Sequence, residues 1–146
     1  FATNRAMIVV APGNPLGITG VDDLTDPDLI VVTCAPAVPC GGYATQIFDT
    51  ADVSVTPDSL ERNVKSVVTK VALGEADAGI AYATDVTASD GDVWGVDIPD
   101  DLNVVAEYPI AIVAETTSPG PAAAFIEFVR SPAGVALLTE YGFGAP

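Results

Sequence analysis

The sequence predicts an α/β fold in which a mixed sheet is flanked by helices in three layers. Three apolar runs have the length of strands, at Ala6–Ala11, Leu29–Thr33 and Asp77–Tyr82, and continuous runs of this kind are typical of strands covered on both faces. The clearest helix repeats valine at i, i+3, i+4 and i+7 from Val64. Strands that alternate with such helices predict a sheet with helices on both of its faces.

The composition limits the class of protein. The chain has 146 residues, of which 49% are hydrophobic and 17% charged, which suits one domain with a core and excludes intrinsic disorder. No apolar run reaches the roughly 18 residues that a membrane span needs. The net charge is −15 and there is no histidine, so we expect no nucleic-acid partner and no histidine triad, and most zinc sites are excluded. Any anion must be captured by neutral N–H and O–H groups in a shielded cleft.

In the first half of the chain, residues 1–5 are polar enough to be a connector. The segments that follow are a strand at Ala6–Ala11, a loop entering a short helix at Gly17–Leu24, a strand at Leu29–Thr33, a helix at Gly41–Thr50, a short strand at Ala51–Val55 and a turn or helix start at Thr56–Ser59. Prolines, glycine and asparagine at 12–15 end the first strand.

The second half begins with the helix from Val64 to Leu73, for which Asn63 is a good N-cap and Gly74 a stop signal. The later segments are a strand at Asp77–Tyr82, a turn at Thr84–Asp85, a strand at Val93–Ile98, a bend or sheet edge at Tyr108–Pro109, and helices at Ala122–Arg130 and Pro132–Tyr141.

The loop Val38–Gly42 is the first candidate for a binding site. It joins a strand to a helix, and its two glycines would let a ligand approach the backbone N–H groups at the helix start, which attract anions. The start of the next helix, at Asn63–Val64, offers a second set of N–H donors, and the Tyr82 hydroxyl a third donor. Each feature alone is also typical of plain structure: a tight turn, a helix cap and a core or rim tyrosine. Ligands of open α/β sheets lie beyond the carboxyl ends of the strands, where these features would meet.

Two cysteines, Cys34 and Cys40, lie six positions apart, which does not match a CxxC metal or redox motif. A disulfide across the loop between them and a pair of unpaired buried thiols both fit this spacing. A third reading makes Cys40 a nucleophile at a helix N-terminus, although no histidine is present to act as its base. Asp77 and Asp85 are candidate general acids, but carboxylates beside strand ends are mostly solvated or capping groups.

The order of three blocks resembles the molybdate-binding protein of the ABC uptake system. The blocks are Val38–Gly41, Glu61–Val64 and Lys70–Asp85. Further similar blocks are Phe1–Arg5, Gly13–Ile18, Tyr108–Ala111, Ala124–Ile126, Ser131–Gly134 and Tyr141–Phe143. The resemblance implies a lobe of the periplasmic-binding-protein type that captures molybdate or tungstate for an ABC permease. It implies no catalysis and no cofactor, in a periplasmic or extracytoplasmic setting, and leaves a lipid anchor open.

The family's site falls on three residues of this chain. The resemblance implies that the oxyanion accepts hydrogen bonds from the backbone N–H groups of Cys40 and Val64 and from the Tyr82 hydroxyl, with no direct contact between the protein and the metal atom. Pro39, Gly41 and Asn63 would support these donors as loop and cap. Cysteine stands at position 40 where the family has alanine, which matters little for a main-chain donor and allows a bond to Cys34.

This sequence departs from the family in one respect. The family's first lobe, which precedes the segment that resembles Phe1–Arg5 and supplies hydroxyl groups to the site, has no counterpart among these 146 residues. We expect a half-receptor, with residues 1–110 as the ligand-binding lobe and residues 111–146 as the return strand and helices that join the other lobe. We expect the apolar faces of those helices to pack on another copy or a separate chain, through Phe125, Phe128, Leu137 and Leu138. Sulfate, phosphate and organic acids remain alternative ligands.

Overall fold

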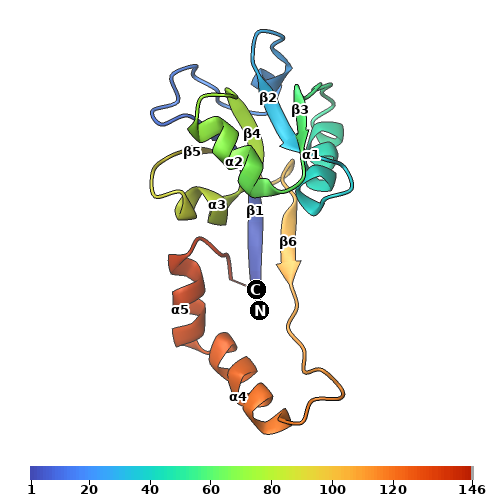
Figure 1. Ribbon diagram of the computed structural model, residues 1–146, viewed down its shortest axis with the longest axis vertical. Coiled ribbons are helices and arrows are strands. Elements are labelled where there is room, and N and C mark those ends of the chain that lie inside the picture. Colours follow the sequence, from blue (N-terminus) through green and yellow to red (C-terminus); the bar gives the residue numbers. More distant parts are fainter. Residues whose placement is uncertain (146) are drawn as a thin grey trace. The chain divides into compact units, whose positions relative to one another are not determined.

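The structure is a computed structural model and describes residues 1–145. The chain divides into two compact units, one of Arg5–Val104 and the other of Phe1–Asn4 with Val105–Pro146. The strands are β1 (Ala2–Val10), β2 (Val31–Cys34), β3 (Ser59–Glu61), β4 (Ala78–Tyr82), β5 (Trp94–Asp97) and β6 (Val105–Tyr108) (Figure 1). The helices are the 3₁₀ helix η1 (Asp22–Thr25) and the α-helices α1 (Pro39–Thr50), α2 (Val64–Ala72), α3 (Ala83–Ala88), α4 (Pro119–Arg130) and α5 (Pro132–Glu140).

The sheet of the larger unit is mixed, as the sequence predicts. Its strand order is β3-β2-β4-β1-β5. Strand β2 runs parallel to both of its neighbours, β3 and β4, whereas β1 runs antiparallel to β4 and β5. The carboxyl ends of the three adjacent parallel strands β3, β2 and β4 therefore lie side by side, at the same end of the sheet.

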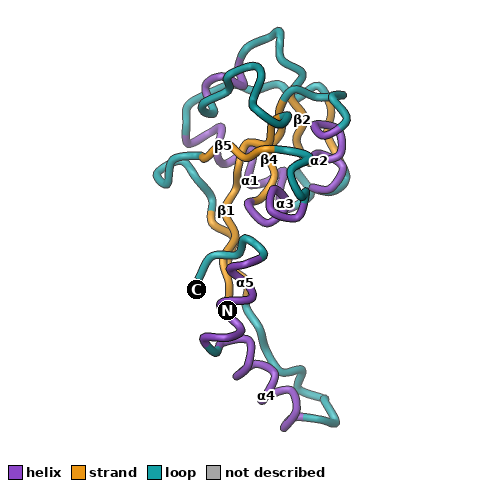
Figure 2. Tube along the Cα trace, turned by 90° about the vertical axis from the view of Figure 1, so that its left-hand side faces the viewer, coloured by secondary structure: helices purple, strands orange, loops and turns teal. Residues whose placement is uncertain are grey.

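Helices cover both faces of the sheet. Successive residues of a strand point to opposite faces, so each buried strand packs against helices on both sides. On one face, Ile47 of α1 packs with Ile8 of β1 and Ile80 of β4. On the other face, Val67 of α2 packs with Val9 of β1, the residue next to Ile8. Helix α3 contacts α2 and β4 (Figure 2). The continuous apolar runs thus correspond to strands that are buried on both sides, and the three-layer prediction is confirmed.

The prediction for the N-terminal segment is wrong. The predicted connector at residues 1–5 is the start of β1, which begins at Ala2. Ala2 and Asn4 are buried there, and β1 pairs with β6. Backbone pairing with a strand more than 100 residues away decides this segment, and the polarity of its side chains does not reveal that partner.

The segment between α1 and α2 also differs from the prediction. Residues 51–55 form no strand, and Asp52 has a positive φ of 55°. The strand forms later, at Ser59–Glu61, where Leu60 lies opposite Thr33 of β2. The predicted turn at Thr84–Asp85 is instead part of α3, which Asp85 caps through the Tyr82 N–H.

In the smaller unit, α4 and α5 meet at Ser131, whose hydroxyl accepts a hydrogen bond from the Gly134 N–H at 3.3 Å. The apolar side chains that we expect to pack on another chain are largely open to solvent. Phe125, Phe128 and Leu137 are exposed by 60%, 51% and 49%, and Leu138 is half-buried. Among the described residues, no single helix is long and apolar enough to cross a membrane. Only α4 and α5 taken together pass that test, and they bend by 64° at their junction.

Candidate anion-binding site

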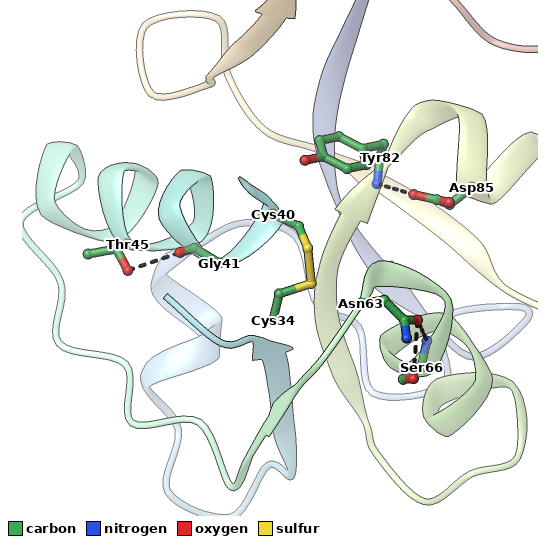
Figure 3. Close-up of a disulfide and its surroundings, with 8 residues drawn as sticks. All are labelled: Cys34, Cys40, Gly41, Thr45, Asn63, Ser66, Tyr82 and Asp85. Carbon is green, nitrogen blue, oxygen red and sulfur yellow. Dashed lines mark hydrogen bonds between the residues drawn. A yellow bond between two sulfur atoms is a disulfide. The ribbon is translucent and has the colours of Figure 1, made fainter. Parts of the chain in front are cut away.

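The three predicted donor residues lie at one edge of the larger unit's sheet. Strand β2 leads into α1, which carries Cys40; β3 leads into α2, which begins at Val64; and β4 ends at Tyr82. These three strands are parallel neighbours, so their carboxyl ends coincide. Cys40 is buried in the same apolar cluster against which Val64 and Tyr82 pack. The structure thus brings together Cys40 and Tyr82, which are 42 positions apart in the sequence (Figure 3).

The start of α1 leaves one main-chain donor without an acceptor in its own helix. Pro39 is the first helical residue and has no N–H. The N–H groups of Gly41 and Gly42 both donate to the Val38 carbonyl, at 2.9 and 3.0 Å. The Cys40 N–H lies too near the helix start to have a partner one turn back. The first turn of α1 thus has one N–H, that of Cys40, with no acceptor inside the helix.

A disulfide joins Cys34, the last residue of β2, to Cys40 in the first turn of α1 (Figure 3). Both residues are buried, with exposures of 1% and 4%. The pairing confirms the first of the open readings of these cysteines. It also excludes Cys40 as a thiolate nucleophile, since its sulfur is already bonded and out of solvent.

Gly41 is required by the chain's own backbone. A Cβ atom at this position would overlap the carbonyl oxygens of Ala35 and Cys34. Gly42, by contrast, is exposed, and its nearest neighbour is the Pro36 carbonyl oxygen at 3.9 Å. Gly41 therefore has a structural reason, the close packing of α1 on the loop after β2, and the approach of a ligand to it stays a prediction.

The start of α2 is capped by a side chain, as predicted. The Asn63 Oδ1 accepts hydrogen bonds from the Ser66 N–H at 3.0 Å and from the Ser66 hydroxyl at 3.2 Å (Figure 3). The N–H groups of Val64 and Lys65, the first two residues of the helix, precede the positions that can bond within it. Val64 is half-buried and Lys65 is exposed.

A polar triad that no local sequence pattern indicates fixes the chain just before this cap. The Lys70 ammonium lies 2.6 Å from Glu61 Oε1 and donates to the Ser59 hydroxyl at 2.8 Å. The Ser59 hydroxyl in turn donates to Glu61 at 2.6 Å. The hydrogen bond from Lys70, helped by that from Ser59, lowers the pKa of Glu61. The opposite charges are visible in the sequence, but their pairing depends on how α2 lies on β3.

Tyr82 is held at both its main chain and its ring. Its N–H donates to Asp85 Oδ2 at 3.1 Å. Its ring meets the ring of Tyr43, on α1, edge to face, with centroids 6.2 Å apart and planes at 81°. In Figure 3 the Tyr82 hydroxyl lies on the side of the ring that faces the start of α1. The helical spacing of Tyr43 predicts only that it packs on the sheet, so this contact was missed.

The two candidate general acids have structural partners. Asp77 Oδ2 accepts the N–H of Ile30 at 2.7 Å. Burial raises the pKa of Asp85, and this effect is opposed by the hydrogen bond from Tyr82 and by the positive charge of Lys65. Asp85 therefore serves the backbone at Tyr82, and Asp77 joins the start of β2 to the start of β4.

The charge around α2 favours an anion more than the net charge suggests. Three of the five basic residues are Arg62, Lys65 and Lys70. Lys70 is paired with Glu61, while Arg62 and Lys65 are exposed on either side of Asn63–Val64. Over residues 1–145 there is no cluster of three side chains that could hold a metal ion. Within the described part of the chain, the charged groups nearest to Asn63–Val64 that lie outside the ion pairs are therefore basic.

The chain is similar to several bacterial binding proteins. It is 40% identical to the molybdate-binding protein ModA of Mycobacterium tuberculosis (strain H37Rv) over 146 residues, which are 100% of this chain and 56% of that protein. Its fold matches a substrate-binding domain from Clostridium difficile assigned to a molybdenum ABC transporter, with a TM-score of 0.81, 21% identity, and coverage of 99% of this chain and 65% of that one. It also matches the sulfate-binding protein SubI of Mycobacterium tuberculosis, with a TM-score of 0.74, 24% identity, and coverage of 97% and 56%.

These similarities extend over almost all of this chain but not over all of its relatives. The chain spans about half the length of the curated relatives that it matches, 56% in the Mycobacterium tuberculosis protein. The family described as bacterial extracellular solute-binding protein matches residues 1–144. The chain belongs to this family of bacterial extracellular solute-binding proteins.

Proposed function

We propose that this chain captures the molybdate or tungstate dianion outside the cytoplasm and delivers it to the permease of an ABC importer. The observation that carries the proposal is the convergence of Cys40, Val64 and Tyr82 at the carboxyl ends of three adjacent parallel strands. The similarity to a molybdate-binding protein over the whole chain supports the choice of ligand.

The binding chemistry rests on neutral donors. The N–H groups of Cys40 and Val64 and the hydroxyl of Tyr82 would each donate to an oxygen of the dianion. Hydrogen bonds to a charged acceptor contribute about 1.5–3 kcal/mol each, and each helix N-terminus adds about 0.3–1 kcal/mol. Several such contacts hold a small dianion without an arginine, and no residue needs to touch the metal atom.

The supporting residues act on the two helix starts. Pro39 begins α1, Gly41 lets it lie against the backbone after β2, and Asn63 caps α2. We propose that residues 1–110 form the ligand-binding lobe and residues 111–146 the return segment of a two-lobed receptor. The apolar face of α4 and α5 would then be covered by another copy or a complementing chain. Light scattering on the wild type and on Phe125→Ser/Phe128→Ser separates the two: association of the wild type alone would indicate another copy, and a monomeric wild type would favour a complementing chain.

The ligand is tested by thermal unfolding of the full-length protein with molybdate, tungstate, sulfate and phosphate. A ligand at about 100 times its Kd adds about 2.7 kcal/mol to the free energy of unfolding. We expect this stabilisation from molybdate and tungstate. Stabilisation by sulfate or phosphate alone would show that the chain binds another anion.

Sulfate is the second candidate ligand, because the fold is shared with a sulfate-binding protein. Similar folds carry different sites, so that similarity does not choose between the two anions. Equal protection by sulfate and molybdate would favour this broader specificity.

The role of the Val64 N–H is tested with Val64→Pro. Proline is favoured at the first residue of a helix, where it removes an N–H that has no helical partner. Asn63 has the extended backbone that a residue before proline prefers, with φ −161° and ψ 161°. We expect Val64→Pro to stay folded and to lose about tenfold or more in molybdate affinity by calorimetry. Val64→Ala, which keeps the N–H, is the matched control and should bind within about threefold of wild type.

A further inference from the structure

The ring pair of Tyr43 and Tyr82 joins two of the elements that carry the proposed donors. Tyr43 lies on α1, three residues after Cys40, and Tyr82 ends β4. The rings meet edge to face at 6.2 Å, a preferred geometry for aromatic pairs, and both side chains are half-buried. The contact therefore connects α1 directly to the end of β4 across the candidate site.

The position of the Tyr82 hydroxyl depends on what its ring contacts. The hydrogen bond from the Tyr82 N–H to Asp85 fixes the main chain, but it does not fix the side-chain torsions. The hydroxyl lies at the far end of the ring, so a small rotation displaces it by a large amount. A donor must lie close to hydrogen-bond distance of its acceptor to contribute. A neighbouring ring that limits this rotation would therefore affect binding.

We propose that Tyr43 is a positioning residue, which holds the ring of Tyr82 so that its hydroxyl is directed at the anion bound by α1. This inference rests on the proposed function and adds a residue to it. Tyr43 acts through its ring, and its own hydroxyl is not required. The disulfide between Cys34 and Cys40 fixes the first turn of α1 on β2, so Tyr43 is a fixed support for Tyr82.

The test is a double-mutant cycle in which molybdate affinity of the full-length protein is measured by calorimetry. Tyr43→Leu removes the ring pair but keeps an apolar side chain, whereas Tyr43→Phe keeps the ring pair and removes only the hydroxyl. Each is made with Tyr82 and with Tyr82→Phe, and circular dichroism verifies that all variants fold. With Tyr82 present, we expect Tyr43→Leu to weaken binding by about threefold to tenfold and Tyr43→Phe by less than about twofold.

The decisive result is the effect of Tyr43→Leu when the Tyr82 hydroxyl is absent. We expect no further loss beyond about twofold in the Tyr82→Phe background, because the hydroxyl that Tyr43 positions is gone. An equal loss in both backgrounds would overturn the inference, as would a loss from Tyr43→Phe as large as from Tyr43→Leu. If Tyr82→Phe binds molybdate as tightly as the wild type, this inference and the donor role of the Tyr82 hydroxyl are both wrong, while capture of molybdate by the chain stands. Failure of the wild type to bind molybdate would overturn the proposed function as well.

Discussion

The starts of α1 and α2 present main-chain donors at the same edge of the sheet, but they are held there by different means. Helix α1 has no side-chain cap; a disulfide and a glycine that fits against the preceding loop fix its first turn. Helix α2 has a side-chain cap, and an ion pair fixes the strand before it. One start depends on covalent and steric constraints, and the other on polar contacts that water and protons can disturb.

The main-chain donors at the starts of α1 and α2 should therefore respond differently to mutation and to pH. Steric overlap with a backbone cannot be relieved by a change of rotamer, and a disulfide is independent of protonation in its oxidised form. A cap and an ion pair are each worth about 1 kcal/mol and depend on solvent and charge. Perturbation of α1 should therefore cost more stability than perturbation of α2.

The largest effect is expected at Gly41. In Gly41→Ala the new Cβ would overlap the carbonyl oxygens of Ala35 and Cys34, so α1 must move away from β2. We expect a loss of about 2–4 kcal/mol in the free energy of unfolding, measured with urea. Gly42→Ala is the matched control, because its nearest neighbour leaves room for a methyl group. It should change stability by less than about 1 kcal/mol, and an equal loss in both variants would show that the overlap is not the cause.

The disulfide should have the next largest effect. The double variant Cys34→Ala/Cys40→Ala opens a short loop, for which the chain-entropy estimate is about 2 kcal/mol. Urea unfolding of the oxidised wild type and the variant measures this difference. Addition of a reductant should destabilise the wild type and leave the variant unchanged. A response of the variant to reductant would mean that the effect does not come from this bond.

The same contrast explains what the sequence could and could not predict. The N-cap at Asn63 depends on residues three positions apart, so its side-chain chemistry and spacing reveal it. Alternating strands and helices likewise predicted the fold class, whereas the three donor residues are implied by the order of blocks that resembles a known family and stay a prediction. The overlap at Gly41, the Lys70–Glu61 pair and the contact of Tyr43 with Tyr82 depend on how elements pack, and no local pattern encodes them.

The strand errors have the same physical origin. Strand β3 forms at Ser59–Glu61, which has only one large apolar residue, because it completes the parallel edge beside β2. The start of β1 is polar but pairs with β6. Strand pairing depends on partners distant in sequence, so the composition of a short segment is a weak guide to it.

The Asn63 cap of α2 should contribute less to the free energy of unfolding than the disulfide at α1 does. Asn63→Ala leaves the Ser66 N–H without its acceptor, and we expect a loss of about 1 kcal/mol by urea unfolding. Asn63→Asp keeps the acceptor and adds a negative charge at the helix start, so stability should be within about 0.5 kcal/mol of wild type or higher. Its affinity for molybdate should nevertheless fall, because the new charge repels an anion bound at Val64. Unchanged affinity in Asn63→Asp would argue that the anion does not bind at this helix start.

The smallest effect is expected at Glu61, and it depends on pH. Hydrogen bonds from Lys70 and Ser59 lower the pKa of Glu61 below its ordinary value of 4.5. The folded protein therefore favours the ionised form, and the resulting stability is fully present above pH 4.5 and is lost as the pH falls through the folded-state pKa. Glu61→Gln should cost less than about 1 kcal/mol at pH 7, and this difference from wild type should shrink in acid.

Asp85 gives a control of opposite sign, because burial raises its pKa above the ordinary value of 3.8. Its contribution to stability is greatest below pH 3.8 and is lost as the pH rises through the folded-state pKa. Asp85→Asn keeps an acceptor for the Tyr82 N–H and should gain stability relative to wild type as the pH rises over that range. Urea unfolding at several pH values measures both differences. Parallel trends in the two variants would mean that a general charge effect, rather than these two local environments, sets the pH dependence.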